Sequence, residues 1–244
     1  MLPIRDHNPS ERTPYVTYGL MALNIAVFLY GYAFITSDQA LNQFYYDYAM
    51  IPARISQGEN YLSLMTSIFM HAGLMHLAGN MLFLWIFGDN LEDVMGHIPF
   101  LIFYLICGVG ADIAQFAFDA HSPIATVGAS GAIAGLMGGY LLLYPKAKVD
   151  IFIFLIIFIR IVPVPAWLML GVWFGLQVFN GISADMSGGG VAYWAHAGGF
   201  VVGFILTLPL WLKLGAGGWW RQTEYHPPHP EAHYPSRILR VMRR

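Results

Sequence analysis

The sequence predicts an all-α protein that is embedded in a membrane, and three observations support this prediction. Apolar residues make up 57% of the 244 residues and charged residues only 11%, which lies outside the range of soluble domains. The apolar residues gather in charge-free stretches near the roughly 20 residues that a helix needs to cross a bilayer. Polar residues of chemically active types open three of these stretches. We therefore expect an integral, multi-pass helical bundle.

Six stretches qualify as membrane spans, which predicts a bundle of six transmembrane helices. They are residues 15–36, 74–88, 98–118, 127–144, 165–182 and 191–212. Residues 1–14 form a short N-terminal segment, residues 15–214 the membrane domain, and residues 215–244 a flexible polar tail. The first span follows two arginines but lacks a small-residue cleavage site, so we expect a retained helix.

The apolar run 149–159 does not fit this series of spans. It is short, it ends at Arg160, and Pro163 and Pro165 follow it. We expect an interfacial or extended entry to the fifth span, and the alternative is a seventh span.

The positions of the basic residues predict the orientation. With six spans and a cytoplasmic N-terminus, all Lys and Arg residues except Arg54 fall on the cytoplasmic side. Both termini are therefore expected in the cytoplasm. A net charge of −2 gives no electrostatic reason to expect nucleic acid as a partner, and the single Cys107 cannot form an internal disulfide.

Three polar motifs open the second, fourth and sixth spans. HAGLMHLAGN contains His71, His76 and Asn80, GASG contains Ser130, and AHAGG contains His196. These three spans cross the membrane in the same direction, so the motifs should meet at similar depth near the outer face. Such polar groups are costly inside a bilayer unless they are paired or functional.

Glycines predict close contact between the fourth and sixth spans. Gly131, Gly135 and Gly139 recur at four-residue steps, and Gly199 and Gly203 do the same in the sixth span. The glycines alone would indicate an ordinary helix-packing seam. His196 lies three residues before Gly199, on nearly the same helical face, which favours contact with Ser130.

These residue types are typical of acyl-transfer chemistry. A serine hydroxyl needs a neutral imidazole within reach to take its proton, which gives Ser130 and His196 the roles of nucleophile and base. The sixth span holds no acidic residue beside His196, so we expect a dyad rather than a triad. His76, Asn80 and the Ser130 backbone N–H would stabilise the oxyanion. For His71 we expect a structural hydrogen-bonding role.

Metal binding is the rival use of these histidines. One possible set is His71, His76 and His196. Another lies in the tail, where His226, His229 and His233 are irregularly spaced through prolines. The sequence contains no HExxH motif.

Taken together, HAGLMHLAGN, GDNLED, GASGAIAG and AHAGGFVVG, in this order and spacing, resemble the rhomboid family of intramembrane serine proteases over about residues 15–212. The resemblance implies a six-helix core and a serine endopeptidase that needs no metal or organic cofactor. Its substrates would be transmembrane proteins, cut near the outer face of a bacterial or archaeal plasma membrane. The site residues that it implies are Ser130 as nucleophile, His196 as general base and acid, His76, Asn80 and backbone amides for the oxyanion, and Gly128, Gly131, Gly199 and His71 in support.

The chain departs from the family pattern at two places. Some relatives carry an aromatic residue one turn after the serine, where this chain has Ala134, so the support of His196 is not evident. Many relatives have a Trp-Arg pair in the first loop, where the nearest candidate here is Tyr61-Leu62. In GDNLED we expect Glu92 to cap or to form an ion pair, while Asp112 in the third span has no assigned role.

Two other classes of function stay open. One is an inactive rhomboid-like protein that binds membrane helices without cutting them. The other is a histidine-metal membrane hydrolase or transporter, which would depend on a metal ion.

Overall fold

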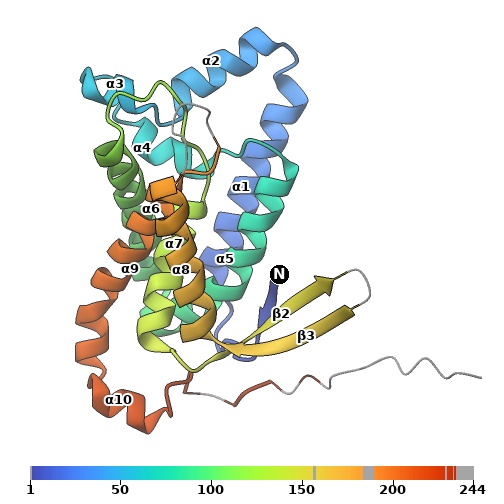
Figure 1. Ribbon diagram of the computed structural model, residues 1–244, viewed down its shortest axis with the longest axis vertical. Coiled ribbons are helices and arrows are strands. Elements are labelled where there is room, and N and C mark those ends of the chain that lie inside the picture. The colour runs from blue at the N-terminus through green and yellow to red at the C-terminus, as the bar shows by residue number, and fades with distance from the viewer. Residues whose placement is uncertain (1, 156–157, 184–189, 229, 233, 235–244) are drawn as a thin grey trace, which may run out of the picture.

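The computed structural model describes residues 2–155, 158–183, 190–228, 230–232 and 234. Long helices run along the molecule (Figure 1). They are α1 (Tyr15–Phe34), α5 (Leu74–Met95), α6 (His97–Phe118), α7 (Ser130–Leu143), α8 (Ala166–Ser183) and α9 (Tyr193–Lys213). Helix α7 forms the centre, because 12 of its 14 residues are buried against the helices around it.

The helices identify an integral, multi-pass membrane protein. Among the described residues, α1, α6, α8 and α9 are long and apolar enough to cross a bilayer, and α5 adds a fifth span when joined to the short helices before it, at a bend of 92°. Helix α7 has only 14 residues, which is short for a span. Each predicted stretch overlaps one long helix, and the count of six crossings stays a prediction.

Helix α5 extends furthest beyond its predicted stretch. This helix continues through GDNLED to Met95, whereas the predicted span ended at residue 88. Glu92 is buried and accepts hydrogen bonds from the N–H groups of Val16 and Thr17, both at 2.8 Å, and from the Thr17 hydroxyl at 2.7 Å. It thereby satisfies N–H groups that the first turn of α1 leaves without helical partners. The predicted capping role of Glu92 is confirmed.

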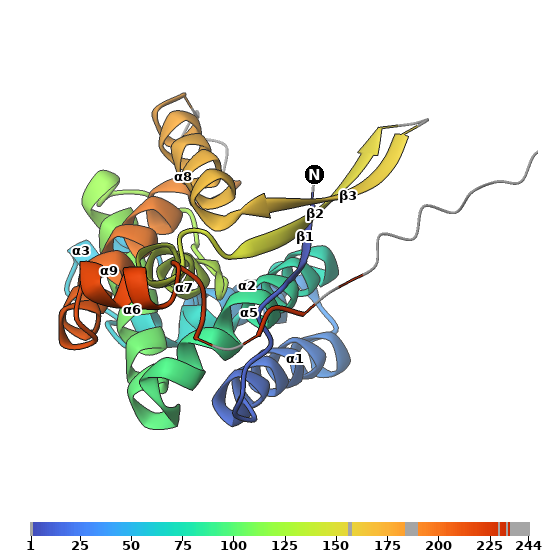
Figure 2. The same cartoon turned by 90° about the horizontal axis from the view of Figure 1, so that it is seen from below.

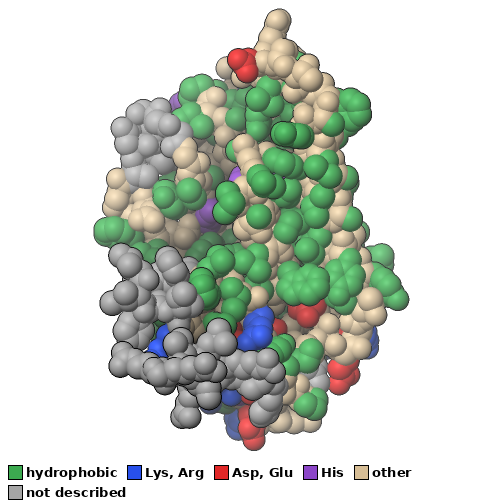
Figure 3. Space-filling view, turned by 90° about the vertical axis from the view of Figure 1, so that its right-hand side faces the viewer, with side chains coloured by type: hydrophobic (Ala, Val, Ile, Leu, Met, Phe, Trp, Pro, Cys, Tyr) green, Lys and Arg blue, Asp and Glu red, His purple; other side chains and the backbone are tan. Residues whose placement is uncertain are grey.

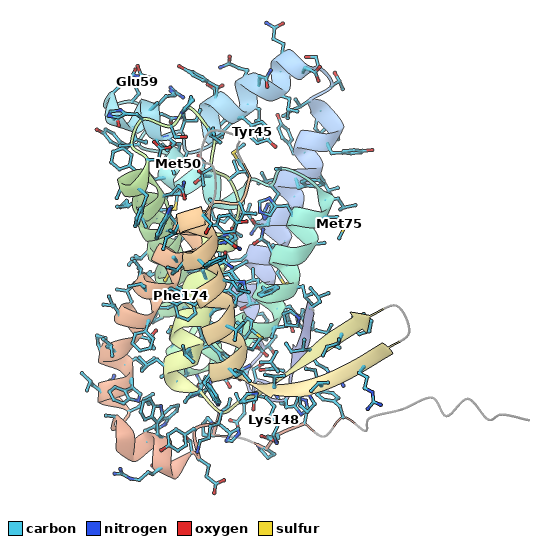
Figure 4. The ribbon with its side chains drawn as sticks, in the orientation of Figure 1. Tyr45, Met50, Glu59, Met75, Lys148 and Phe174 are labelled. Atoms are coloured by element: carbon cyan, nitrogen blue, oxygen red, sulfur yellow. The ribbon has the colours of Figure 1, made fainter. Side chains whose placement is uncertain are left out.

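Residues 37–70, which connect α1 to α5, form a series of short helices. They contain α2 (Asp38–Tyr48), α3 (Pro52–Ser56), α4 (Ser63–Thr66) and the 3-10 helix η1 (Ser67–Phe69). These elements cover one end of the bundle, and Glu59 between them lies at the opposite end of the molecule from Lys148 (Figure 4). Arg54 is held there by Glu59 at 3.2 Å and by the ring and carbonyl of Tyr46.

A small sheet at the other end corrects the all-α prediction. Strands β1 (Leu2–Asp6), β2 (Lys148–Leu155) and β3 (Phe158–Pro165) pair antiparallel in the order β1-β2-β3. The described residues of the apolar run, 149–155 and 158–159, thus lie in two paired strands that extend away from the bundle (Figure 2). They are extended, as expected, and do not form a seventh span. The buried Asp150 of β2 pairs with Arg5 at 2.7 Å and with His7 at 2.8 Å, which ties the N-terminal segment to the hairpin.

The described part of the tail packs against the same end. Helix α10 (Gly217–Gln222) buries Trp219 against Tyr144, which the expectation of a flexible polar tail did not foresee. Further on, the Ala232 N–H donates to the His7 carbonyl at 2.7 Å. His229 and His233 of the suspected tail metal site lie outside the described residues.

Apolar and basic side chains occupy different parts of the surface. Apolar side chains cover much of the face in Figure 3, and the Lys and Arg side chains visible there lie toward the end that carries the sheet. Many apolar side chains on the helices are strongly exposed, among them Tyr32 at 82% and Met75 at 83%. Lipid contact explains this exposure.

Candidate active site

The polar residues of the three motifs meet at one cavity. His76, Asn80, Ser130 and His196 all line a space of about 1030 Å³. Each lies within the first two turns of its helix, α5, α7 or α9. The three helix starts therefore converge in the structure, as predicted, although His76 and His196 are 120 positions apart in the sequence.

Ser130 and His196 are in direct contact. The distance from Ser130 Oγ to His196 Nε2 is 2.8 Å, and both side chains are half-buried. Ser130 is the first residue of α7, and helix geometry leaves the N–H groups of that first turn without intrahelical acceptors. A hydroxyl, an imidazole and free backbone donors therefore lie together at one point of the cavity.

Glycines bring the two helices to this distance, as predicted. A Cβ on Gly199 would contact the carbonyl oxygen of Gly131, and a Cβ on Gly203 would contact that of Gly135. A Cβ on Gly138 would likewise contact the carbonyl oxygen of Phe200. Backbone-to-backbone contact of α7 with α9 thus sets the separation between Ser130 and His196.

Two residues of α8 hold the other side of His196. The Nδ1 atom of His196 lies 2.9 Å from Oε1 of Gln177, and the Trp173 ring lies against the imidazole with 5.8 Å between centroids and 30° between planes. The sequence analysis missed both residues. Gln177 could have been found from the cost of an amide in a charge-free span, which is the argument that singled out the motifs.

His76 lines the same cavity as Ser130, from α5. The Ala72 N–H donates to Nδ1 of His76 at 3.4 Å, so in the neutral ring the proton resides on Nε2. The edge of the ring that carries Nε2 lies against Gly128, where a Cβ would come within 2.8 Å of it. Gly128 has a φ of +128°, and both this backbone angle and the ring exclude a side chain.

Asn80 and His71 complete the α5 side of the site. The buried Asn80 donates from Nδ2 to the His76 carbonyl at 3.0 Å, which uses one of its two amide protons. His71 packs edge to face on His76, with 5.1 Å between centroids. This contact packs His71 against the ring of His76, and its expected hydrogen-bonding role stays a prediction.

Helix α6 contributes two buried polar residues to the cavity wall. Asp112 accepts a 2.6 Å hydrogen bond from Ser67, whose carbonyl in turn accepts from the Gly128 N–H at 3.0 Å. Gln115 accepts from the Ala195 N–H at 3.2 Å, next to His196. These contacts fix the segment before Ser130 and the start of α9, and they give Asp112 a structural partner.

The described histidines do not gather as a metal centre. No group of three or more His, Cys, Asp or Glu side chains is placed to hold a metal ion in the described ranges. His71 contacts His76, and His196 is bonded to Ser130 and Gln177.

The sequence is similar to a known protein family and to named members of that family. The family described as the Rhomboid domain matches residues 58–213. The chain is 37% identical over 165 residues to Rhomboid protease GluP of Bacillus subtilis, which covers 67% of this chain and 29% of that protein. It is 30% identical over 151 residues to Rhomboid protein 1, mitochondrial, of Saccharomyces cerevisiae, covering 59% of this chain and 40% of the relative. The chain thus spans well under half the length of these curated relatives.

Proposed function

This chain belongs to the rhomboid family, and from that premise we propose that it is an intramembrane serine endopeptidase with a Ser130–His196 dyad. The observation that carries the proposal is the 2.8 Å contact between Ser130 Oγ and His196 Nε2 at the wall of a cavity. A serine becomes a useful nucleophile only when a neighbouring base accepts its proton. The rhomboid proteases among the relatives support the same reading.

In the proposed reaction, Ser130 Oγ attacks the carbonyl carbon of the scissile peptide bond. The new bond joins Oγ to that carbon, and the hydroxyl proton moves to Nε2 of His196. When the carbon–nitrogen bond breaks, His196 returns this proton to the leaving amine. Water then attacks the acyl-enzyme with His196 again as base, which releases the acid and restores the Ser130 hydroxyl.

The oxyanion would be held by donors from α5 and α7 that line the same cavity. The N–H of Ser130 at the start of α7, Nε2–H of His76 and the second amide proton of Asn80 are the proposed donors. Each such donor is typically worth about 3 kcal/mol of transition-state stabilisation. Gly128, with no side chain, allows the His76 ring to approach the serine.

We propose transmembrane proteins as substrates, with the bilayer as the surrounding medium. The cavity mixes the polar residues above with apolar ones such as Met75, Phe83 and Trp173, which suits an unwound stretch of a membrane helix. The proposed topology has six crossings with both chain ends in the cytoplasm, so that the site lies near the outer face of a bacterial or archaeal plasma membrane. The chemistry uses no metal and no organic cofactor.

The test uses purified protein in detergent with a fluorophosphonate probe and a transmembrane substrate. We expect labelling and cleavage by the parent, loss of both in Ser130→Ala and His196→Ala, and no effect of a chelator. Ser56→Ala, which changes an exposed serine far from the dyad in sequence, is the matched control and should behave like the parent. A folded parent that neither reacts with the probe nor cuts any substrate would overturn the proposal in favour of a helix-binding protein.

A further inference from the structure

We propose that Gln177 is the positioning residue of this site, which holds His196 in the one tautomer that can take a proton from Ser130. The inference rests on the proposed function, because it concerns the base of that reaction. The carrying observation is a continuous array from Ser130 Oγ to His196 Nε2 at 2.8 Å and from His196 Nδ1 to Gln177 Oε1 at 2.9 Å.

The tautomer follows from what each atom can do. A carboxamide oxygen only accepts hydrogen bonds, so His196 must donate to Gln177 from Nδ1–H. In a neutral imidazole the other nitrogen then has a free lone pair, and this nitrogen is the one that faces Ser130. Gln177 thereby selects the basic form of Nε2.

An amide could equally turn its NH₂ group toward the ring, and a second contact prevents this. Nε2 of Gln177 lies 3.3 Å from the carbonyl oxygen of Trp173, one turn earlier in α8. A carbonyl oxygen can accept a hydrogen bond but cannot donate one, so the amide turns its NH₂ group toward Trp173 and its oxygen toward His196. With the opposite orientation the amide would donate to Nδ1, and a wrong tautomer of this kind costs about 10⁴-fold in triad enzymes.

The surroundings of Gln177 keep this geometry rigid. Its side chain is 8% exposed. Helix α8 is docked on α9 by Trp173 and Phe174, whose rings pack on Phe200 with centroid distances of 6.2 and 4.8 Å. Trp173 also packs on the imidazole of His196. Helix α7 offers no aromatic side chain for this purpose, because position 134 is an alanine.

A neutral acceptor also suits the membrane better than the carboxylate of a triad. A buried carboxylate loses its hydration at a cost of several kcal/mol, whereas an amide supplies an oxygen acceptor without a net charge. Asp112, the acidic residue of the cavity wall, is bonded to Ser67. Gln177 is therefore the group that this chain places behind its base.

The test compares Gln177→Leu, which removes the acceptor at similar volume, with Gln177→Glu, which restores an acceptor only when ionised. Leu176→Ala is the matched control, because Leu176 is the preceding residue of α8 and is 50% exposed. We expect Gln177→Leu to lower kcat and the rate of probe labelling about 10²-fold with little change in KM. The rate of Gln177→Glu relative to the parent should rise with pH, and that of Gln177→Leu should stay flat.

A second measurement reads the tautomer without any turnover. In ¹⁵N spectra of histidine-labelled protein, with the His196 signals assigned by their loss in His196→Ala, the parent should show a protonated Nδ1 and an unprotonated Nε2. Gln177→Leu should shift these signals toward a mixture of tautomers. Unchanged signals and parent-like labelling in Gln177→Leu would overturn the inference, as would a Gln177→Glu variant indistinguishable from Gln177→Leu at every pH. A parent that shows this tautomer yet does not react with the probe would count against the protease proposal and not against the role of Gln177.

Discussion

Gly199 lies so close to Gly131 that a Cβ on Gly199 would meet the carbonyl oxygen of Gly131. The obstacle is backbone, which cannot rotate away as a side chain can. The spacing between α7 and α9, and with it the contact between Ser130 and His196, therefore depends on the absence of a single methyl group.

Gly199→Ala should separate these helices and weaken the dyad. We expect at least a tenfold loss of probe labelling and a destabilisation of about 1–3 kcal/mol, because overpacking a tight contact forces backbone shifts. Labelling rates and thermal unfolding in detergent measure both effects. Gly171→Ala in α8 is the control, since its new Cβ would have no neighbour within 4 Å. Equal behaviour of the two variants would show that the close contact does not set the geometry of the site.

Removing an oxyanion donor should slow turnover without weakening substrate binding. For His76→Phe we expect kcat to fall about 10²-fold with KM nearly unchanged, because the interaction forms only as negative charge develops. Steady-state cleavage of a transmembrane substrate gives both constants. Leu74→Ala, at the exposed start of the same helix, should match the parent. A rise in KM at constant kcat would instead place His76 in ground-state binding.

Glu92→Gln should destabilise the fold while the site chemistry stays intact. The carboxylate accepts three hydrogen bonds from Val16 and Thr17, and replacing one oxygen by NH₂ sets a donor against a donor. We expect a loss of about 1–3 kcal/mol. Reaction of Cys107 with a thiol dye during heating reports unfolding, because this cysteine is fully buried and is the single one in the sequence.

The control for this variant is Glu59→Gln. Glu59 forms an exposed ion pair with Arg54, and such pairs contribute about 0–1 kcal/mol. A Glu92→Gln protein that unfolds at the parental temperature would contradict the capping role.

Asp6 should make stability decrease between about pH 4 and pH 8. Burial, and to a lesser extent the nearby Asp89, raises the pKa of Asp6 from 3.8 to about 8, against the opposing effect of the hydrogen bonds from Tyr140 and Asn8. Between these pH values the folded protein keeps a proton that the unfolded chain has lost. Each pH unit across this window therefore removes up to about 1.4 kcal/mol of stability, and the loss is complete above the folded-state pKa.

Asp6→Asn should flatten this dependence, because an amide resembles the neutral carboxyl group and cannot ionise. Thermal unfolding of parent and variant at a series of pH values measures the difference. Asp38→Asn, at an exposed position of α2, should keep the slope of the parent. A parent slope that survives in Asp6→Asn would assign the titration to another group.

The helix starts and the contact between Ser130 and His196 could be predicted from the sequence, because both follow from patterns within single helices. Charge-free stretches located each long helix, and the glycine steps predicted the approach of Ser130 to His196. The role of Gln177 could not be predicted, because it depends on how α8 is rotated against α9. The packing of Trp173 and Phe174 on Phe200 determines this rotation. No periodicity within α8 determines that rotation.

The sheet could not be predicted from the sequence for a different reason. Strand β2 pairs with residues of β1 that lie about 145 positions earlier, and the apolar residues that follow Asp150 show no alternation that would indicate a strand. Helix α5 also continues past residue 88, where the charged residues of GDNLED indicated the end of a span. Burial of Glu92 under the start of α1 allows the helix to continue.

The hairpin described above also limits how large the sheet can grow. The Ala166 N–H donates back to Ala147 beside β2, and strand residues alternate in direction, so positions 163 and 165 turn their backbone toward the open edge of β3. Both positions are prolines, which have no N–H to offer to an incoming strand. At these two positions the edge of β3 therefore offers no N–H donor with which a strand of a second molecule could pair.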